Sequence, residues 1–202
     1  SGNPTTQLDT NYYVPNGGGK RQLRHWRDPF LFKDGGRWLQ LVCAAAKDRP
    51  AHSCGAVGLA ESPDLRQWTV LPPLDVECFC EEMECPQLYV RNGRYYLVFS
   101  TLKALINPAS AEQLRGGPRN STFVMIADNL MGPYRLAKHP HIIPPESPLQ
   151  PYACQLVSFR GKDYCMGTVW SETPSYMCDP IPVVFGESGI YADMLPAQCE
   201  LS

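Results

Sequence analysis

Two acidic residues, Asp28 and Glu84, stand at the start of two similar stretches of the chain. The stretches read DPFLFKDGGRWLQLVC and ECPQLYVRNGRYYLVFS, and in each an acid precedes an apolar run, a turn and a second apolar run. This pattern predicts a β-hairpin. Two carboxyl groups that their surroundings hold in different protonation states can act as acid and base on one substrate. We therefore take Asp28 and Glu84 as the candidate catalytic residues.

Neighbouring charges favour a different protonation state for each acid. Glu84 lies beside Glu81 and Glu82, and burial among like charges favours a protonated carboxyl group. Asp28 follows Arg27, whose positive charge favours the ionised form. A simpler alternative is that each acid only caps a strand and fixes a turn. The acidic stretch before Glu84 also fits a solvated loop.

Both acids belong to a repeated pattern of short strands. Pro29 aligns with Pro86 at an offset of 57 residues, and Gly93 aligns with Gly161 at an offset of 68. Each repeat contains four short runs rich in aromatic and β-branched residues, separated by turn residues. A repeated four-stranded antiparallel meander is typical of β-propeller blades. The predicted fold is therefore all-β and β-propeller-like, with three clear blades.

The blades occupy one predicted domain, residues 26–202, which follows a polar, glycine-rich N-terminal arm, residues 1–25. Propellers usually have about 4–8 blades, so three blades leave exposed strand edges. Strands from the arm and the C-terminal tail, a second copy or another subunit could complete the ring. Of these we favour self-association, with a two-fold homodimer as the commonest arrangement.

The innermost strand of each propeller blade points its leading end into the central channel, so residues at these ends converge. We expect Asp28, Glu84 and the head of the third blade to surround one substrate pocket. The candidate substrate-binding residues are His25, Trp26, Arg27, Glu82, Tyr152, Gln155 and Trp170. The aromatic members also fit the core, where strand aromatics are more often found. His139 and His141, which flank a proline, are expected on the surface.

The composition limits the classes of partner. A chain of 202 residues with 44% hydrophobic residues can bury one good core. The formal charge of -2 and the pI near 6.1 argue against nucleic acid and anionic membranes as partners. No apolar run is long enough to span a bilayer, and the first ten residues lack a leader pattern. We expect a soluble protein without a cofactor, in either a cytoplasmic or a secreted setting.

Cysteine is frequent in this chain. An odd number of cysteines, nine, cannot pair completely within one molecule. Cys78, Cys80 and Cys85 crowd the acidic loop, but their spacing fits no common zinc pattern. The favoured interpretation is that the cysteines are thiols, with a disulfide in this loop and a metal site as the alternatives. No metal site is predicted.

Three motifs in the same order, and a blade-closing phrase, resemble those of the five-bladed propeller glycoside hydrolases, which include invertases, levansucrases and their arabinanase and xylosidase relatives. WRDPF resembles the Arg-Asp-Pro motif, whose aspartate holds sugar hydroxyls and stabilises the transition state. MECPQLY resembles the Glu-Cys-Pro motif, whose glutamate is the general acid/base. PYACQ resembles a later motif that lines the sugar pocket, and ESPDLRQWTVL resembles a phrase that closes a blade. The resemblance covers about residues 26–170 and implies a carbohydrate substrate.

The chain departs from this family at the nucleophile. The enzymes carry an aspartate in an Asn-Asp-Pro-Asn-Gly motif one blade or more before Arg-Asp-Pro. Here the nearest text is YVPNG, with Val14 in place of the aspartate and too few residues before Asp28 for a blade. Hydrolysis with retention needs two carboxyl groups about 5–5.5 Å apart. Asp9 and Asp193 are the candidates for a substitute.

Three functions remain open at this point. The first is a compact glycoside hydrolase with Glu84 as general acid/base and Asp28 as transition-state stabiliser. The second is an enzyme that reuses the same pocket for acid-assisted cyclisation, elimination or isomerisation. The third is a carbohydrate-binding module without catalysis.

Overall fold

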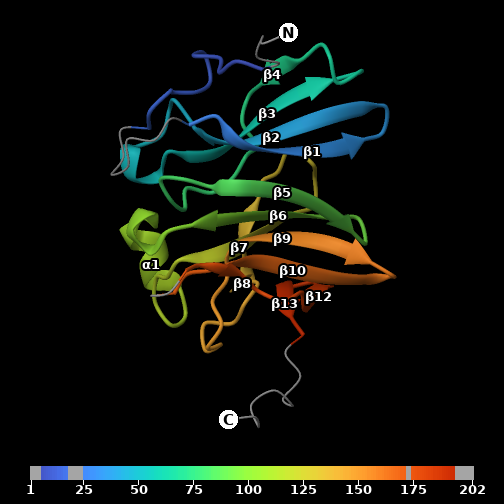
Figure 1. Ribbon diagram of the computed structural model, residues 1–202. Coiled ribbons are helices and arrows are strands. Elements are labelled where there is room, and N and C mark those ends of the chain that lie inside the picture. Colours follow the sequence, from blue (N-terminus) through green and yellow to red (C-terminus); the bar gives the residue numbers. More distant parts are fainter. Residues whose placement is uncertain (1–5, 18–24, 172–173, 194–202) are drawn as a thin grey trace.

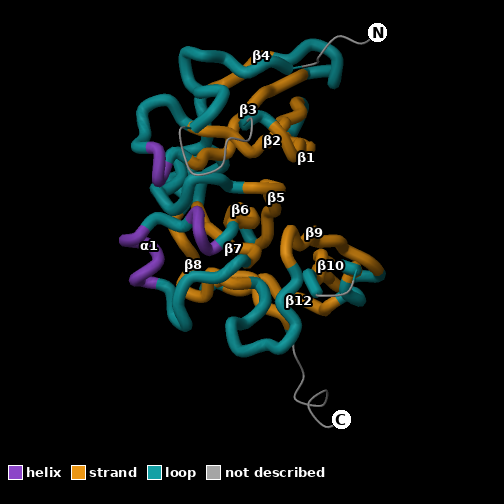
Figure 2. The backbone as a smooth tube through the Cα atoms, turned by 60° about the vertical axis from the view of Figure 1, so that its left-hand side comes forward, coloured by secondary structure: helices purple, strands orange, loops and turns teal. Residues whose placement is uncertain are grey.

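The computed structural model describes residues 6–17, 25–171 and 174–193. Its strands form antiparallel sheets that lie one above another, as Figures 1 and 2 show from two directions. Each sheet is built from strands that follow one another along the chain. The predicted all-β, propeller-like architecture with three blades is confirmed.

The elements of the three sheets follow in chain order. The first sheet contains β1 (Arg27–Asp34), β2 (Arg37–Ala45), β3 (Gly55–Ser62) and β4 (Thr69–Leu71). The second contains β5 (Glu84–Arg91), β6 (Arg94–Thr101), β7 (Ser121–Ala127) and β8 (Arg135–His141). The third contains β9 (Tyr152–Phe159), β10 (Lys162–Val169), β12 (Ile181–Gly186) and β13 (Gly189–Ala192), and β11 (Tyr176–Met177) pairs with the end of β10.

Helical structure in the described residues is short. The helix α1 (Pro108–Gln113) lies between β6 and β7. The Asn107 side chain caps it by accepting a hydrogen bond from the Ser110 amide at 2.8 Å. Two 3₁₀ turns occupy Ala51–Ser53 and Lys103–Leu105. No described helix is both long and apolar enough to cross a bilayer.

The middle sheet is buried on both faces. Along β6, Leu97 and Phe99 pack into the core shared with the first sheet, whereas Tyr96 and Val98 pack into the core shared with the third sheet. Successive strand residues point to opposite faces. The run RYYLVFS is therefore apolar almost throughout, because neither of its faces meets water.

The two outer sheets differ in how their far faces are covered. Residues 6–17 pack against the first sheet, where Tyr13 is buried against Val42 and Ala44. The Tyr13 hydroxyl donates to the Leu71 carbonyl at 2.6 Å, which fixes this segment on the sheet. The remainder of the predicted arm, 1–5 and 18–24, lies outside the described residues, so the division at residue 25 stays a prediction.

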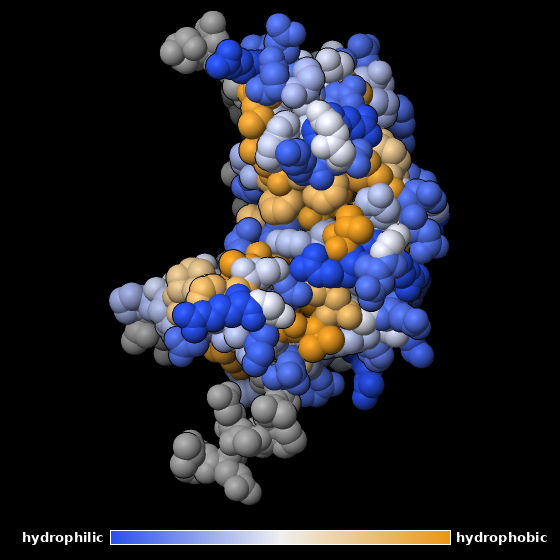
Figure 3. Space-filling model, turned by 90° about the vertical axis from the view of Figure 1, so that its right-hand side faces the viewer, coloured by the Kyte–Doolittle hydropathy of each residue, from blue (hydrophilic) through white to orange (hydrophobic). Residues whose placement is uncertain are grey.

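The far face of the third sheet is open. Val157, Phe159, Met177 and Val184 are each about half exposed, at 49%, 58%, 57% and 52%. A separate feature is a hollow on one side of the molecule, between its upper and lower parts, in the space-filling view (Figure 3). An open apolar sheet face is what an incomplete ring leaves behind. The homodimer stays a prediction.

His141 is buried, which corrects the expectation that it lies on the surface. Only 8% of the residue is exposed, and its ring lies 4.7 Å from that of Phe123. Burial, with a smaller effect of the Arg119 charge, lowers the pKa of His141 to about 4. The neighbouring carboxylate of Glu146 acts in the opposite direction.

We predict that this histidine makes folding pH-dependent. The unfolded imidazole takes up a proton near its ordinary pKa of about 6.5, whereas the folded one does so only near 4. The free energy of unfolding therefore decreases as the pH is lowered from about 6.5 to about 4. The loss approaches about 3 kcal/mol. Urea unfolding of His141→Gln between pH 7 and 4 should show a shallower pH dependence than the wild type. His139→Gln, which removes an exposed neighbour, is the control and should keep the wild-type slope.

Candidate functional site

The same irregularity recurs at the head of each innermost strand. Between Arg27 and Phe30, β1 advances three residues while its partner β2 advances two. The register of β5 shifts in the same way after Glu84, and that of β9 shifts after Tyr152. Such β-bulges re-aim side chains and are common near active sites. Arg27, Glu84 and Tyr152 therefore hold equivalent places in the three sheets.

The bulges contain left-handed backbone at residues other than glycine. Asp28, Cys85 and Ala153 have φ values of 58°, 48° and 53°. Such conformations cost about 1–3 kcal/mol each and cluster at functional sites. Three strained residues at equivalent places thus mark this end of the sheets as the candidate site.

Arg27 joins carboxylates from two sheets. Its Nη2 lies 2.7 Å from Oε2 of Glu82 and 3.0 Å from Oε1 of Glu84, and its Nε lies 3.6 Å from Oδ2 of Asp28. The side chains of Glu82 and Glu84 are only 2% and 12% exposed. Reasoning from the sequence weighed only the neighbouring glutamates of Glu84 and missed this counter-charge.

The third sheet contributes an aromatic pair beside Glu84. The Tyr152 hydroxyl donates a hydrogen bond to Oε2 of Glu84. The ring of Trp170 lies 4.7 Å from that of Tyr152 at an interplanar angle of 33°, and 52% of Trp170 is exposed. The two oxygens of Glu84 are thus held by Arg27 and by Tyr152, with an exposed aromatic surface next to them.

A small cavity opens beside Asp28. It has a volume of about 180 Å³ and is lined by Asp28, Pro29, Phe30, Cys85, Pro86, Gln87 and Gln155. The Cys85 amide donates to Oδ2 of Asp28 at 3.2 Å, which links the heads of the first two sheets. Gln155 reaches the cavity from the third sheet. Glu84 is not among the lining residues, although Arg27 contacts both it and Asp28.

The predicted substrate-binding residues fall into two groups. Arg27, Glu82, Tyr152, Gln155 and Trp170 lie around Asp28 and Glu84 through the contacts described above. Trp26 packs instead against residues 6–17, with its ring 5.1 Å from that of Tyr13 and its Nε1 donating to Thr6 Oγ1 at 3.3 Å. His25 is also buried there, and its amide donates to the Pro15 carbonyl.

Gln87 is a residue that the sequence reasoning did not single out. Its Nε2 donates to the Cys154 carbonyl at 2.8 Å, and its Oε1 accepts from the Leu156 amide at 3.1 Å. The Tyr89 hydroxyl also donates to this Oε1 at 2.6 Å. The buried amide therefore ties β5 to β9 and sets the position of Tyr152 and Gln155. In the sequence, Gln87 directly follows the Glu-Cys-Pro motif, and this position could have indicated its role.

Cys85 lies between the two candidate acids but is poorly suited to act as a nucleophile. Burial, with the negative charges of Asp28 and Glu84, raises its pKa to about 11. The reactive thiolate is therefore scarce near neutrality. Each of the eight cysteines in the described residues is a free thiol. No group of three His, Cys, Asp or Glu side chains in these residues is arranged to hold a metal ion.

The two substitutes considered for the nucleophile lie elsewhere. Oδ1 of Asp9 accepts from the Asn11 amide at 2.8 Å in an exposed turn. Asp193 is exposed and directly follows β13, the outermost strand of the third sheet. Glu84, by contrast, heads the innermost strand of the second sheet. The role of either aspartate as a substitute nucleophile therefore stays a prediction.

Relatives share this chain's sequence and fold. A levansucrase of Pseudomonas savastanoi pv. glycinea is 31% identical over 204 residues, which span 80% of this chain and 46% of that protein. A second levansucrase, from Pseudomonas syringae pv. actinidiae, is 31% identical over 178 residues, or 73% of this chain and 39% of the relative. The chain belongs to the propeller glycoside hydrolase superfamily. No family model matches it.

Solved structures show the same propeller fold. The inulosucrase from Halalkalicoccus jeotgali bound to kestose has a TM-score of 0.65 at 24% identity and covers 84% of this chain. Bacillus subtilis levansucrase has a TM-score of 0.63 at 14% identity and covers 83%. The chain corresponds to 50% and 49% of these two structures. It therefore spans half or less of the propeller proteins that it resembles.

Proposed function

We propose that this chain carries the acid/base half of a saccharide-processing propeller site, with Glu84 as general acid/base and Asp28 as transition-state stabiliser. One observation supports this proposal above the others. Glu84 has both oxygens oriented, by Arg27 and by Tyr152, at the convergent ends of the innermost strands. A carboxyl group that exchanges a proton with a glycosidic oxygen must be held in such a fixed orientation.

The other residues have supporting roles in the proposal. Arg27 holds Glu84 and Glu82 and adds positive charge beside Asp28. Tyr152 and Trp170 offer aromatic surface to a sugar ring, and Gln155 offers an amide at the Asp28 cavity. Sucrose and kestose, which are bound in solved relatives, are the first substrates to test.

A second candidate is a site that binds a saccharide, or acts on it without a nucleophile. The observation that favours it is the departure from the family motif at Val14, where the enzymes carry the nucleophilic aspartate that retention needs. Trapping of a glycosyl-enzyme intermediate would separate these candidates. A trapped intermediate supports hydrolysis through a nucleophile, whereas turnover without one to a product that contains no added water supports the non-hydrolytic chemistry.

Binding gives a direct test of the proposed pocket. We expect Asp28→Ala to weaken the binding of kestose at least about ten-fold in calorimetry, because the carboxylate would hydrogen-bond sugar hydroxyls and such charged bonds contribute about 1.5–3 kcal/mol. Asp34→Ala removes a surface acid at the other end of β1 and serves as the control. Equal affinities of the two variants would contradict the role of Asp28.

A further inference from the structure

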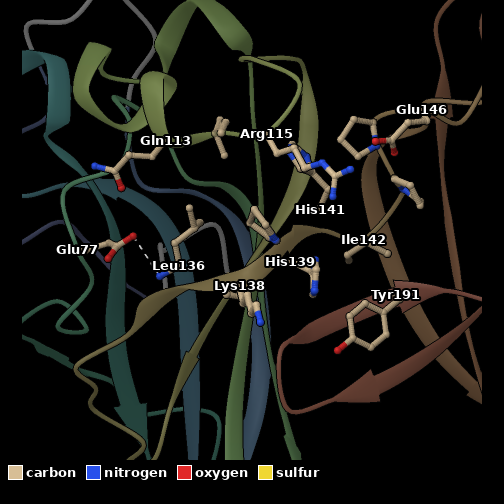
Figure 4. A pocket seen from close by; sticks show the side chains of 15 residues that line it. Glu77, Gln113, Arg115, Leu136, Lys138, His139, His141, Ile142, Glu146 and Tyr191 are labelled. Atoms are coloured by element: carbon tan, nitrogen blue, oxygen red, sulfur yellow. Dashed lines mark hydrogen bonds between the residues drawn. The ribbon is translucent and has the colours of Figure 1, made fainter.

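A second, larger cavity lies between the outer strands of the second and third sheets. Its volume is about 510 Å³, within the range of small-molecule sites. Its walls come from β8, residues 142–146, the chain that follows α1, and Tyr191 of β13 (Figure 4). It shares no lining residue with the cavity beside Asp28.

The wall of this cavity is a bulge in β8 that two neighbouring segments hold in place. The pairing of β7 with β8 slips between Leu136 and His141, so the residues between them leave the ladder. Oε1 of Glu77 accepts from the Leu136 amide at 3.1 Å, and the His139 amide donates to the Ser188 carbonyl at 2.9 Å. The cavity wall is therefore preorganised and does not depend on a ligand for its shape.

Glycine is required where the third sheet approaches this bulge. A Cβ atom at Gly189 would lie 2.3 Å from the His139 carbonyl oxygen, and the φ value of this residue is +153°. Only glycine lets the β12–β13 turn come this close. Tyr191 on the same hairpin is thereby brought to the rim of the cavity.

The polar groups of the lining carry both signs of charge. Arg115 and Lys138 are able to donate hydrogen bonds to a ligand, whereas Glu77 and Glu146 are able to accept them. Within the part of the chain that the structure describes, none of the four has an ion-pair partner within 4.0 Å. An anionic or cationic ligand would meet like charge from half of this set. A neutral ligand whose hydroxyl groups both donate and accept can use all four.

The remaining lining residues give such a ligand an apolar surface and one buried polar atom that lacks a hydrogen-bond partner in the described part of the chain. Pro140, Ile142 and Pro144 form apolar wall, and Tyr191 adds an aromatic ring with a hydroxyl group. His141 also lies in the wall, with Nδ1 3.0 Å from Ser121 Oγ and with no hydrogen-bond partner for Nε2 among the described residues. A buried polar atom without a partner in a cavity wall favours a ligand that supplies one.

We infer that this cavity binds one or two rings of a neutral saccharide, at a site separate from Asp28 and Glu84. A saccharide combines adjacent hydroxyl groups with an apolar ring face, which is the combination that the lining offers. The choice of kestose as probe rests on the proposed function. The argument from the residues that line the cavity is independent of that function. The inferred site would hold a sugar unit beside, and not within, the catalytic pocket.

The test is an NMR titration of the whole chain with kestose, observed at the histidine rings and the tryptophan indoles. We expect saturable shifts at His139 and His141 in the wild type and equally in Glu84→Gln. Arg115→Ala and Lys138→Ala should each weaken this binding at least about ten-fold, since each removes a charged hydrogen-bond donor. Both side chains are exposed at the rim. Arg66→Ala, which removes an exposed arginine in a distant turn, is the control and should bind like the wild type.

The possible results separate the two sites. Saturable shifts at Trp170 without shifts at His139 and His141 would overturn this inference and leave the proposed function intact. Shifts at the two histidines without any at Trp170 would support the inference and count against the proposed pocket. Shifts at the two histidines that grow linearly without saturation, or that persist unchanged in Arg115→Ala and Lys138→Ala, would also overturn it.

Discussion

Replacement of Glu84 by glutamine should lower kcat by about 10²–10⁴-fold in any saccharide reaction that this chain supports. The amide keeps the size of the carboxyl group but can neither give nor take the proton. Kestose affinity should change much less, because most binding contacts remain. The measurement is a steady-state assay with sucrose and kestose, combined with calorimetry of binding.

Glu112→Gln supplies the matched control for this experiment. Glu112 is exposed on α1 and makes no contact with the candidate site, so its variant should keep wild-type turnover. If Glu84→Gln turned over substrate as fast as Glu112→Gln, Glu84 would not be the acid/base. Loss of binding together with turnover would instead assign Glu84 to substrate binding.

The largest effect on stability is expected from Gln87→Leu. Gln87 is 1% exposed, and its removal leaves the Cys154 carbonyl, the Leu156 amide and the Tyr89 hydroxyl without this partner. Each buried group left unsatisfied costs about 1–3 kcal/mol, so we expect the free energy of unfolding to fall by about 3 kcal/mol or more. Urea unfolding at constant pH measures this change.

A surface glutamine gives the comparison for this variant. Gln67 is exposed in a turn, and Gln67→Leu should stay within about 0.5 kcal/mol of the wild type. A similar small change in Gln87→Leu would show that the second and third sheets do not depend on this amide. Because Gln87 positions β9, we also expect the variant to disturb the contact of Tyr152 with Glu84.

Much of the fold could be predicted from the sequence, because it is encoded locally. Alternating apolar runs and turn residues define the strands, and the repeat from Pro29 to Pro86 defines the sheets. The run at β6, apolar almost throughout, correctly indicated a strand even though the reason for it, burial on both faces, appears only in the folded chain.

The candidate site was predictable in part. The motifs identified Asp28 and Glu84 and the neighbours Arg27 and Tyr152, which hydrogen-bond or pair with Glu84 in the structure. The bonds of Gln87 to the third sheet join residues more than sixty positions apart, and no local pattern encodes them. The same holds for the burial of His141, since its pattern of flanking residues looks like a loop.

The sequence also did not predict which segments pack on the far faces of the first and third sheets. The polar segment 6–17 looked like an extended arm, yet Tyr13 inserts into the first sheet and is 1% exposed. Two adjacent tyrosines in a polar stretch give little warning that one of them, Tyr13, is buried in this way. On the third sheet no described segment has the same role, and its apolar face stays open.

The most direct test of the central claim is a crystal structure of Glu84→Gln soaked with kestose. The proposal predicts a sugar ring with hydroxyl groups on Asp28, a glycosidic oxygen within hydrogen-bond reach of residue 84, and a ring face against Tyr152 or Trp170. A well-ordered saccharide bound elsewhere, with this end of the innermost strands empty at saturating ligand, would contradict it.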